Sequence, residues 1–358
     1  MQLSLLSAHV LRDALYARSR ERSYVLVAAL AAFAFIGCSD SSRRAPDADL
    51  PREQGPELAL DEGQDQGRTA LTPGFQRVEA GSATLGSPAS EPCREAINET
   101  QWNVTITRAF EIAETEVTEG EYSRLVATAR DPIDDCGDAC PVNLVSWHEG
   151  AAYCNALSDE GGFERCYTCD GAQDATRCTD SPTYAGEAIV DCPGFRLPTE
   201  AEWEFAYRAG TASMTPYGDF APSACSECGP DAGAVDDGVV SCHNSEVDRA
   251  PCRDLSFFGG PACAGRQPVA SGAPNASGLY DMGGNLDEWC HDVYVIDATS
   301  LRERDPVGLS DRFGTTDTRT VRGASWSVPR ARARAASRAG ANGIQRLEER
   351  GFRCVRTL

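Results

Sequence analysis

Beyond about residue 71, the alternation of apolar and polar residues predicts short strands with few helices between them. Phe75–Val78 and Ala83–Leu85 fit short strands on either side of a turn at Gly81–Ser82. The alternating run Asn103–Ile112 fits one longer strand. Apolar residues at helical spacing predict a helix over Ser146–Leu157.

Two more helices are indicated by capping boxes, in which Ser or Thr is followed three residues later by Glu or Gln. The boxes Thr118–Glu121 and Thr199–Glu202 predict helices through about Ala129 and over Glu200–Arg208. Long loops rich in Gly, Pro, Asp and Cys lie between the predicted elements, at about 159–194 and 212–270. Loops of that length need cross-links unless they have a core of their own. The pattern therefore predicts an irregular α+β domain with disulfide-tied loops.

The N-terminal segment has the features of an export signal. An apolar run over Tyr24–Ile36 follows several arginines, and it is shorter than the roughly 20 residues that cross a bilayer. It ends in Gly37 and Cys38, and this junction resembles a bacterial lipobox. We expect residues 1–37 to be a lipoprotein signal peptide and Cys38 to be acylated. A plain cleaved signal and a buried hydrophobic helix are the alternatives.

Residues 38–71 are expected to form a disordered acidic tether, because they contain no aromatic residue and more acid than base. Residues 72–358 then form the folded domain. Together these expectations describe an exported protein, lipid-anchored in the bacterial cell envelope on its periplasmic or surface face.

The overall composition narrows the possible chemistry. The formal net charge of −21 argues against nucleic acid as a partner, because nucleic-acid binding needs positive potential. The sequence contains no lysine, which excludes lysine-based catalysis. Its 16 cysteines favour disulfides if the protein is exported.

Several motifs, in order along the chain, resemble the formylglycine-generating enzyme, or sulfatase-modifying factor, family. The most specific are FRLPTEAEWEFAYRAGT at 195–211 and NASGLYDMGGNLDEW at 275–289. Weaker matches are Glu116–Thr118, Val145–Trp147, Val321–Trp326 and the terminal Gly351–Arg353. The resemblance spans roughly 72–356 and implies the family's variant of the C-type-lectin-like fold.

The resemblance also implies a structural calcium site. The family's ligand positions correspond to Asp281, Gly284, Leu286 and Glu288, where two carboxylates and two backbone carbonyls can converge on a tight Gly-Gly turn. Oxygen ligands at flexible geometry suit Ca²⁺. The alternative is a turn whose carboxylates are merely solvated.

The family's oxidase cysteines are missing. In active members the strand after Arg-Gly-Gly-Ser-aromatic continues as x-C-x4-C, and the two thiolates bind copper(I), a soft ion that needs soft ligands. Here Val328 stands at the first cysteine position, and the shortened segment has no counterpart for the second. No cysteine occurs between Cys290 and Cys354. We therefore expect no copper and no catalytic residues of the family type.

The resemblance implies one permanent disulfide, between Cys154 and Cys354. The family's second disulfide would join positions that here are Tyr207 and Ala335, so both partners are absent together. Cys290 has no evident partner and is the expected unpaired cysteine.

Other cysteines can be interpreted from their spacing. Cys136 and Cys140 flank a short turn and could close a local disulfide. Cys166-x-x-Cys169 and Cys225-x-x-Cys228 are expected in structural disulfides, with zinc binding or a redox pair as alternatives.

The segment after Val328 replaces the family's catalytic region. Arg330, Arg332 and Arg334 alternate with alanines, so a strand would place three guanidinium groups on one face. With Ser325 and Trp326 they form a candidate cleft that could bind an anion or carboxylate. A charged edge that merely prevents strand pairing is the alternative.

Two classes of function remain. The missing cysteines favour a non-oxidase binding or scaffolding module, similar to the motility-associated lipoproteins that share this fold. Its partners would be the membrane, through the lipid anchor, and an envelope protein or peptide of unknown identity. The alternative is an enzyme, either a residual formylglycine generator or a periplasmic oxidase with a different residue set, as in siderophore-maturation relatives.

Overall fold

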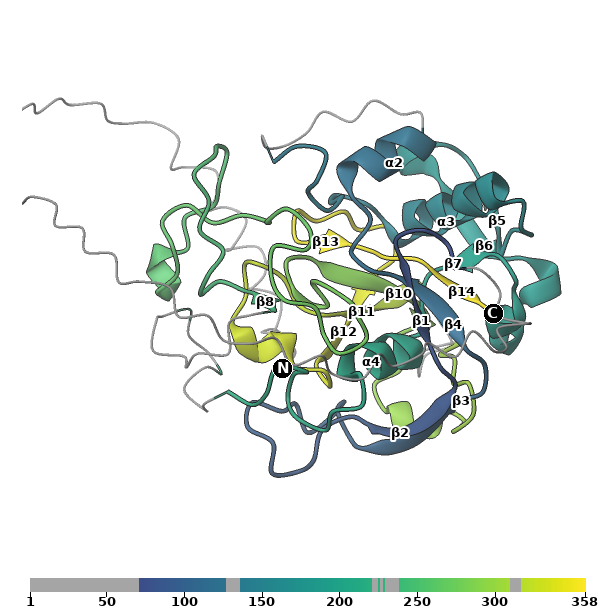
Figure 1. Ribbon diagram of the computed structural model, residues 1–358, viewed down its shortest axis with the longest axis horizontal. Coiled ribbons are helices and arrows are strands. Elements are labelled where there is room, and N and C mark those ends of the chain that lie inside the picture. The colour runs from purple at the N-terminus through teal and green to yellow at the C-terminus, as the bar shows by residue number, and fades with distance from the viewer. Residues whose placement is uncertain (1–70, 127–135, 221–224, 226–227, 229–237, 310–316) are drawn as a thin grey trace, which may run out of the picture. The chain divides into compact units, whose positions relative to one another are not determined.

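The computed structural model describes residues 71–358 except 127–135, 221–224, 226–227, 229–237 and 310–316 (Figure 1). The expected signal peptide, Cys38 and the acidic tether lie outside the described residues. Contacts divide the chain at Gln64, and only the unit from Asp65 to Leu358 contains described residues. None of the described helices is both long and apolar enough to cross a membrane.

The described part of the unit is built around two four-stranded sheets. The first has the order β1-β4-β14-β7, formed by Phe75–Val78, Phe110–Ala113, Val355–Thr357 and Phe195–Arg196. The second has the order β12-β11-β10-β13, formed by Arg338–Asn342, Thr318–Arg322, Asp287–Val293 and Arg350–Gly351. Three smaller two-stranded sheets pair β2 (Gly81–Leu85) with β3 (Trp102–Ile106), β5 (Tyr167–Asp170) with β6 (Arg177–Asp180), and β8 (Val239–Val240) with β9 (Gly283–Gly284).

Three α-helices are described, each opened by a complete capping box. They are α2 (Glu119–Leu125), α3 (Trp147–Gly161) and α4 (Glu200–Arg208), capped by Thr118, Ser146 and Thr199. Short 3₁₀ turns complete the element list: η1 Gln173–Ala175, η2 Pro182–Tyr184, η3 Gly186–Asp191, η5 Ser256–Phe258, η6 Ala298–Ser300 and η7 Arg330–Ala333. This confirms the expected α+β class with few helices, and α4 has the predicted bounds.

Two strand predictions were wrong in detail. Gly81 and Ser82 are part of β2 rather than a turn, and β2 pairs with β3 while β1 pairs with β4. The run Asn103–Ile112 is broken into β3 and β4, because the Asp305 carboxylate accepts hydrogen bonds from the backbone N–H and the hydroxyl of Thr107. A partner distant in sequence thus ends a strand whose own alternation continues.

Disulfides cross-link the long loops, as their length predicted. Cys166–Cys192 and Cys169–Cys178 tie the loop after α3, while Cys228–Cys242 and Cys252–Cys263 tie the loop after α4. Cys93–Cys225 links that second loop to the segment between β2 and β3. Each cysteine of the two Cys-x-x-Cys motifs therefore pairs outside its own motif.

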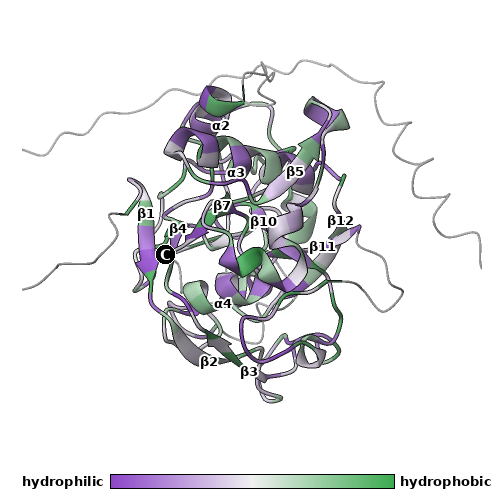
Figure 2. Ribbon diagram, turned by 90° about the vertical axis from the view of Figure 1, so that its right-hand side faces the viewer, coloured by the Kyte–Doolittle hydropathy of each residue, from purple (hydrophilic) through white to green (hydrophobic). Residues whose placement is uncertain are grey.

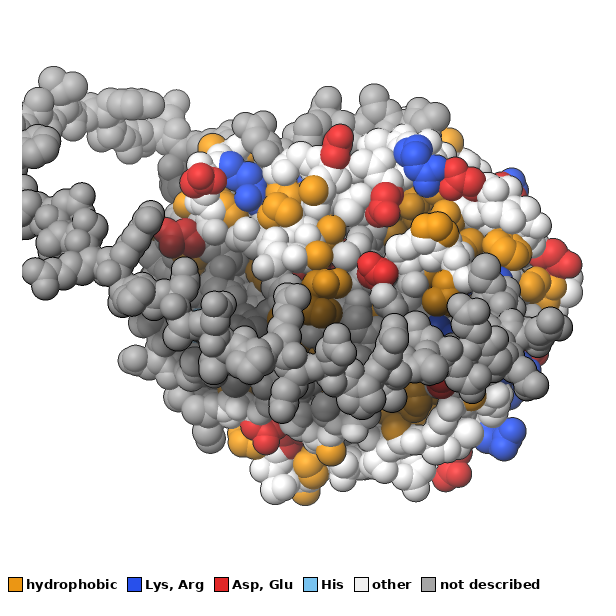
Figure 3. Space-filling view, viewed as in Figure 1, with side chains coloured by type: hydrophobic (Ala, Val, Ile, Leu, Met, Phe, Trp, Pro, Cys, Tyr) orange, Lys and Arg blue, Asp and Glu red, His pale blue; other side chains and the backbone are white. Residues whose placement is uncertain are grey.

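The interior is unusually rich in charge. One apolar cluster surrounds Trp147 and Trp289 beside α3, and another surrounds Trp203 beside α4. Buried ion pairs such as Arg196–Glu202 accompany these clusters, and Figure 2 shows hydrophilic stretches in both α4 and β10. On the face in Figure 3, acidic and basic side chains are scattered among uncharged ones.

Candidate functional site

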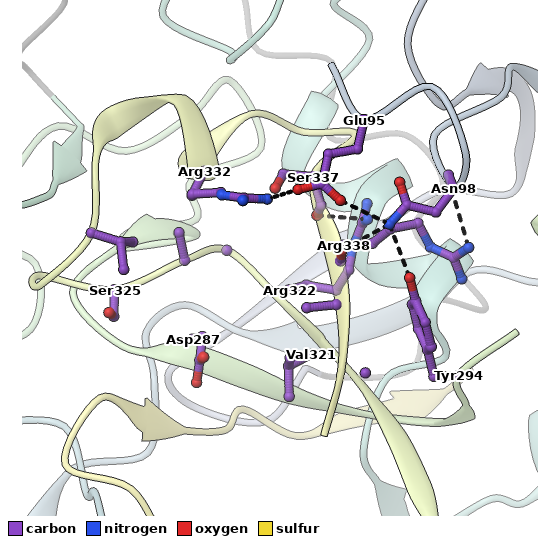
Figure 4. A pocket seen from close by; sticks show the side chains of 15 residues that line it. Glu95, Asn98, Asp287, Tyr294, Val321, Arg322, Ser325, Arg332, Ser337 and Arg338 are labelled. Carbon is purple, nitrogen blue, oxygen red and sulfur yellow. Dashed lines mark hydrogen bonds and ion pairs between the residues drawn. The ribbon is translucent and has the colours of Figure 1, made fainter. Parts of the chain in front are cut away.

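A pocket of about 450 Å³ lies along β12, at the edge of the second sheet (Figure 4). Ser325, Val328 and Arg332 line it from the segment after β11, and Glu95 and Asn98 line it from the segment between β2 and β3. The pocket therefore includes Val328, the position at which the sequence resemblance places the family's first oxidase cysteine. A cavity of this size is typical of small-ligand or peptide sites.

The turn after β11 aims this segment into the pocket. Gly323 and Ala324 both have positive φ, at 91° and 65°, and a side chain on Gly323 would press against the Met282 carbonyl and the Trp203 ring. The backbone N–H of Trp326 then donates to the Asn285 carbonyl, and the Val328 carbonyl accepts from the backbone N–H of Cys242. These bonds fix the backbone on both sides of the pocket-lining residues.

Only part of the candidate cleft faces the pocket. Trp326 is instead buried in an apolar cluster with Cys228, Cys242 and Leu255, under the guanidinium of Arg253. Among the described lining residues, Ser325 and Arg332 come from the predicted set, whereas Trp326, Arg330 and Arg334 do not contribute.

The predicted Arg-Ala strand was wrong. Arg330–Ala333 is the 3₁₀ turn η7, which begins after Pro329 and is closed by a 2.9 Å bond from the Arg332 N–H to Pro329 O. A turn of about three residues cannot keep every second side chain on one face. Ala331 packs against Met214 and Phe220, which requires a small side chain there, and Arg330 is buried. The segment thus folds inward rather than lying as a charged strand.

Arg334 is the clearest departure from a cationic cleft. Its guanidinium is fully buried and forms two hydrogen bonds with Glu99, at 2.7 and 2.8 Å, and one with Glu91 at 2.8 Å. Its remaining donors reach the carbonyls of Ala331 and Cys93, both at 2.9 Å. We call Arg334, Glu91 and Glu99 the Arg334 clamp. The clamp fixes the segment after Val328 to the segment between β2 and β3, so its charge is unavailable to an anion.

The clamp shifts the ionisation of its members. Burial raises the pKa of Glu91, although the hydrogen bond from Arg334 opposes that rise. Burial alone would lower the pKa of Arg334, but the hydrogen bonds and charge of Glu99 and Glu91 raise it.

Arg332 differs from Arg334 in exposure. Its side chain is 53% exposed and pairs with Glu95, which is 36% exposed, across the rim of the pocket (Figure 4). The other charges at the pocket are paired internally: Arg338 with Glu200, Arg322 with Glu204, and Asp287 with Arg350. The pocket therefore has mixed polar walls whose charges compensate one another.

The described residues do not bring thiols to this pocket. Fourteen of the described cysteines are in disulfides, and no lining residue in the described part of the chain is a cysteine. Cys290 is free, as expected, but it is buried on β10 in the cluster around Tyr207, and burial raises its pKa well above the ordinary value. The residues present at the pocket do not fit a copper(I) site, which needs soft ligands.

The two predicted disulfides are both present. Cys154 on α3 is bonded to Cys354 before β14, with Cα atoms 6.2 Å apart, and this links two elements 200 residues apart in sequence. Cys136 and Cys140 close the local turn, with Cα atoms 5.8 Å apart.

The expected calcium turn runs from Asp281, which precedes β9, to Glu288 on β10. Asp281 is buried and accepts a 2.7 Å bond from the Ala270 N–H. Glu288 is fully buried and binds Arg353 through both oxygens, and it also accepts from the Trp203 indole N–H at 2.9 Å. Gly284 and Leu286, the two expected carbonyl ligands, lie between them in sequence, and the Leu286 N–H donates to Glu116.

The charge balance at this turn favours a cation, although Glu288 is already engaged. Three buried carboxylates, Glu116, Asp281 and Glu288, lie around Arg353. Burial and the neighbouring carboxylates raise the pKa of Glu116, and burial raises the pKa of Asp281 to about 6. The described residues hold no cluster of three or more acidic, His or Cys side chains arranged for a metal, so carbonyls would have to complete the site. The oxygen donors present fit Ca²⁺ in type.

Sequence reasoning missed Glu91, Glu95, Glu99 and Asn98. They precede the first family motif and carry no spacing signal of their own. The available hint was the three glutamates near Cys93, a cysteine that is cross-linked to Cys225 in the loop after α4.

Comparison with known proteins gives a consistent family assignment. The family described as "Sulfatase-modifying factor enzyme 1-like domain" matches residues 62–358. The formylglycine-generating enzyme of Mycobacterium tuberculosis is 28% identical over 307 residues, which cover 77% of this chain and 95% of that protein.

Two further similarities are partial or structural. Chaperone protein LppX of Paenibacillus barcinonensis is 28% identical over 195 residues, which cover 52% of this chain and 63% of that protein. The solved structure of Treponema denticola variable protein 1 has a TM-score of 0.58 at 23% identity and covers 79% of this chain and 95% of that one. That likeness concerns the fold alone.

Proposed function

Because the chain belongs to the sulfatase-modifying factor family, we propose that it is a non-oxidase binding or scaffolding member whose pocket along β12 holds a ligand in place of the copper chemistry. The observation that carries this proposal is Val328, which lines the pocket at the first oxidase cysteine position. The Arg334 clamp supports it, since the shortened segment after Val328, which has no counterpart of the second cysteine, is held by buried ion pairs.

A copper(I) titration tests this proposal. Purified protein with intact disulfides competes for copper(I) with bicinchoninate, and the formylglycine-generating enzyme of Mycobacterium tuberculosis is titrated in parallel. We expect no stoichiometric copper(I) binding by this chain, because Val328 offers no soft donor. Stoichiometric binding that survives replacement of the buried Cys290 by Ala would contradict the proposal and point to an alternative oxidase site.

We also propose that the turn between Asp281 and Glu288 binds a structural calcium ion, which would tie β9 to β10. Asp281 and Glu288 would supply carboxylate oxygens, and Gly284 and Leu286 would supply carbonyls. Chelation should lower the melting temperature of the wild type, because an ion bound only by the folded state stabilises it. It should have less effect on Asp281→Ala. This variant is preferable to replacing Glu288, which would leave Arg353 buried without its partner.

Anchoring through acylated Cys38 remains a proposal from the sequence. Radiolabelled palmitate should be incorporated into the wild type but not into Cys38→Ser. Equal labelling of the two proteins, or a wild type that does not partition with membranes, would contradict it.

A further inference from the structure

Among the strands of the described residues, β12 is an edge strand, and it lies beside the pocket. It is the terminal strand in the order β12-β11-β10-β13, and Ala339 and Gly340 in its centre are exposed and line the pocket. Figure 2 places β12 at the margin of the unit. An exposed edge strand offers unpaired backbone groups to another extended chain.

The hydrogen-bond pattern shows which groups face that edge. On β11 the Thr318 carbonyl accepts from the Tyr294 N–H, on the β10 side, whereas the preceding Asp317 carbonyl accepts from the Gly343 N–H, on the β12 side. Backbone groups alternate in direction along an antiparallel strand. Val321 and Ala339 therefore form a backbone hydrogen-bonded pair, and Thr320 and Gly340 form a non-hydrogen-bonded pair. The N–H and carbonyl of Gly340 consequently point outward.

The neighbouring outward groups of β12 are partly engaged. The Arg338 carbonyl accepts a long bond of 3.5 Å from Asn98 Nδ2, and the Asn342 carbonyl accepts from the Gln345 N–H at 2.9 Å. Gly340 lies between them and offers both a donor and an acceptor to the same side. One residue of an extended chain, with its own N–H and carbonyl, matches that pair.

The usual protections of an edge strand are absent from the centre of β12. Natural edges carry charges, prolines or bulges that prevent pairing. Here Ala339 is small, Gly340 has no side chain, and the register with β11 is regular over all five residues. The Tyr294 ring fills the face of β12 toward which a side chain at position 340 would point, since an added Cβ would lie 2.5 Å from it. The edge is thus flat and open to a main chain.

The pocket next to this edge is suited to an uncharged side chain. Its charges are compensated in pairs, as described above, and its other lining side chains include the hydroxyls of Tyr294, Ser325 and Ser337. A charged side chain would have to displace one of the ion pairs. A partner segment with a small apolar or hydroxyl side chain would contact the pocket hydroxyls without that cost.

We propose that β12 binds an extended segment of a partner protein as an added β-strand, with Gly340 exchanging main-chain hydrogen bonds and every second, uncharged side chain of the segment entering the pocket. This rests on the proposed binding function and names its ligand as polypeptide in extended form. Recognition of this kind takes affinity from the main chain and specificity from alternate side chains.

The test uses a positional-scanning library of fluorescein-labelled nonapeptides, measured by fluorescence polarisation with the purified full chain. The best sequence is then resynthesised with N-methylation at each position in turn. Because an N-methyl group removes one donor, binding should weaken about tenfold at the position facing Gly340 and should be unchanged at the adjacent positions.

Two matched variants locate the site. Ala339→Lys places a charge on the exposed edge and should weaken peptide binding at least about tenfold. Ala172→Lys adds the same charge at an exposed position in the β5–β6 turn and should leave it unchanged. Melting temperatures of both proteins confirm folding.

Several results would overturn the inference. One is a library without any binder. Another is a binder that is insensitive to both N-methylation and Ala339→Lys; if Arg332→Ala weakens it, the pocket binds peptide without strand addition and the proposed function survives alone. A third is self-association that Ala339→Lys abolishes while no peptide binds, which would make a second copy of this chain the occupant.

Discussion

The Tyr207 hydroxyl donates a 3.0 Å hydrogen bond to the carbonyl of Ala333, which joins α4 to the segment that follows Val328. Tyr207 and Ala335, the positions at which the resemblance places the family's second disulfide, belong to the same buried apolar cluster. The two segments are therefore held together by packing and one hydrogen bond, without a covalent link. The tyrosine ring fills its space only because Gly283 has no side chain, since a Cβ there would lie 2.2 Å from the hydroxyl.

This arrangement predicts coupling between Tyr207 and Gly283. Tyr207→Phe should lower the free energy of unfolding by about 1–3 kcal/mol, because the buried Ala333 carbonyl loses its donor. Gly283→Ala should be more costly in the wild type than in the Tyr207→Phe background, where the clashing oxygen is gone. A double-mutant cycle by urea denaturation measures the difference. Additive effects would mean that the two residues do not contact each other as described.

The Arg334 clamp should contribute much more to stability than the ion pair on the pocket rim. Arg334→Met leaves Glu91 and Glu99 buried without a cation and should cost about 3–5 kcal/mol. Arg332→Met breaks an exposed pair with Glu95 and should cost at most about 1 kcal/mol. Chemical denaturation of both variants tests this comparison. Equal costs would show that Arg334 is no more buried or engaged than its neighbour.

The clamp also marks the limit of what the sequence could predict. Helix α4 was predicted to the residue because its capping box is a local signal. The partners of Arg334 are 235 and 243 residues away and belong to no motif, so periodicity suggested a strand where the tertiary structure forms a turn. A local pattern cannot report a buried partner of opposite charge, because the same alternation of Arg and Ala fits an exposed strand and a buried turn.

The cysteines show the same contrast. The local pair Cys136–Cys140 follows from spacing, and Cys154–Cys354 follows from the family resemblance. Cys93–Cys225 had neither signal, and it is the link that brings the pocket-lining segment around Glu95 toward η7. The pocket was therefore predictable on the side of Ser325 and Val328 and unpredictable on the side of Glu95 and Asn98.

Acid should destabilise the protein partly through His148. Its pKa is lowered to about 4, first by burial and then by the charges of Arg319 and Arg177, and its neutral Nδ1 accepts a hydrogen bond from the Cys178 N–H. Because the folded pKa lies below the unfolded value of about 6.5, the unfolded state binds the proton more readily. The stability contributed by neutral His148 is present above pH 6.5 and is lost as pH falls toward 4.

His148→Asn isolates this contribution, because the amide oxygen can accept the same hydrogen bond but does not titrate. The difference in unfolding free energy between wild type and variant should shift against the wild type between pH 6.5 and 4. Measurements at half-unit pH steps give the slope. A difference that is constant with pH would show that His148 titrates normally.

The central claim is that this family member has lost the oxidase, and mass spectrometry of a substrate peptide tests it most directly. A sulfatase-type Cys-x-Pro-x-Arg peptide is incubated with the protein, added copper(I), reductant and oxygen, with the Mycobacterium tuberculosis enzyme as positive control. The sequence resemblance places Val328 at the first thiolate position and gives no counterpart for the second, so the peptide mass should stay unchanged, as in the sample without enzyme. Conversion of cysteine to the aldehyde above that background would contradict the account and would require a second pair of thiolates elsewhere in the chain.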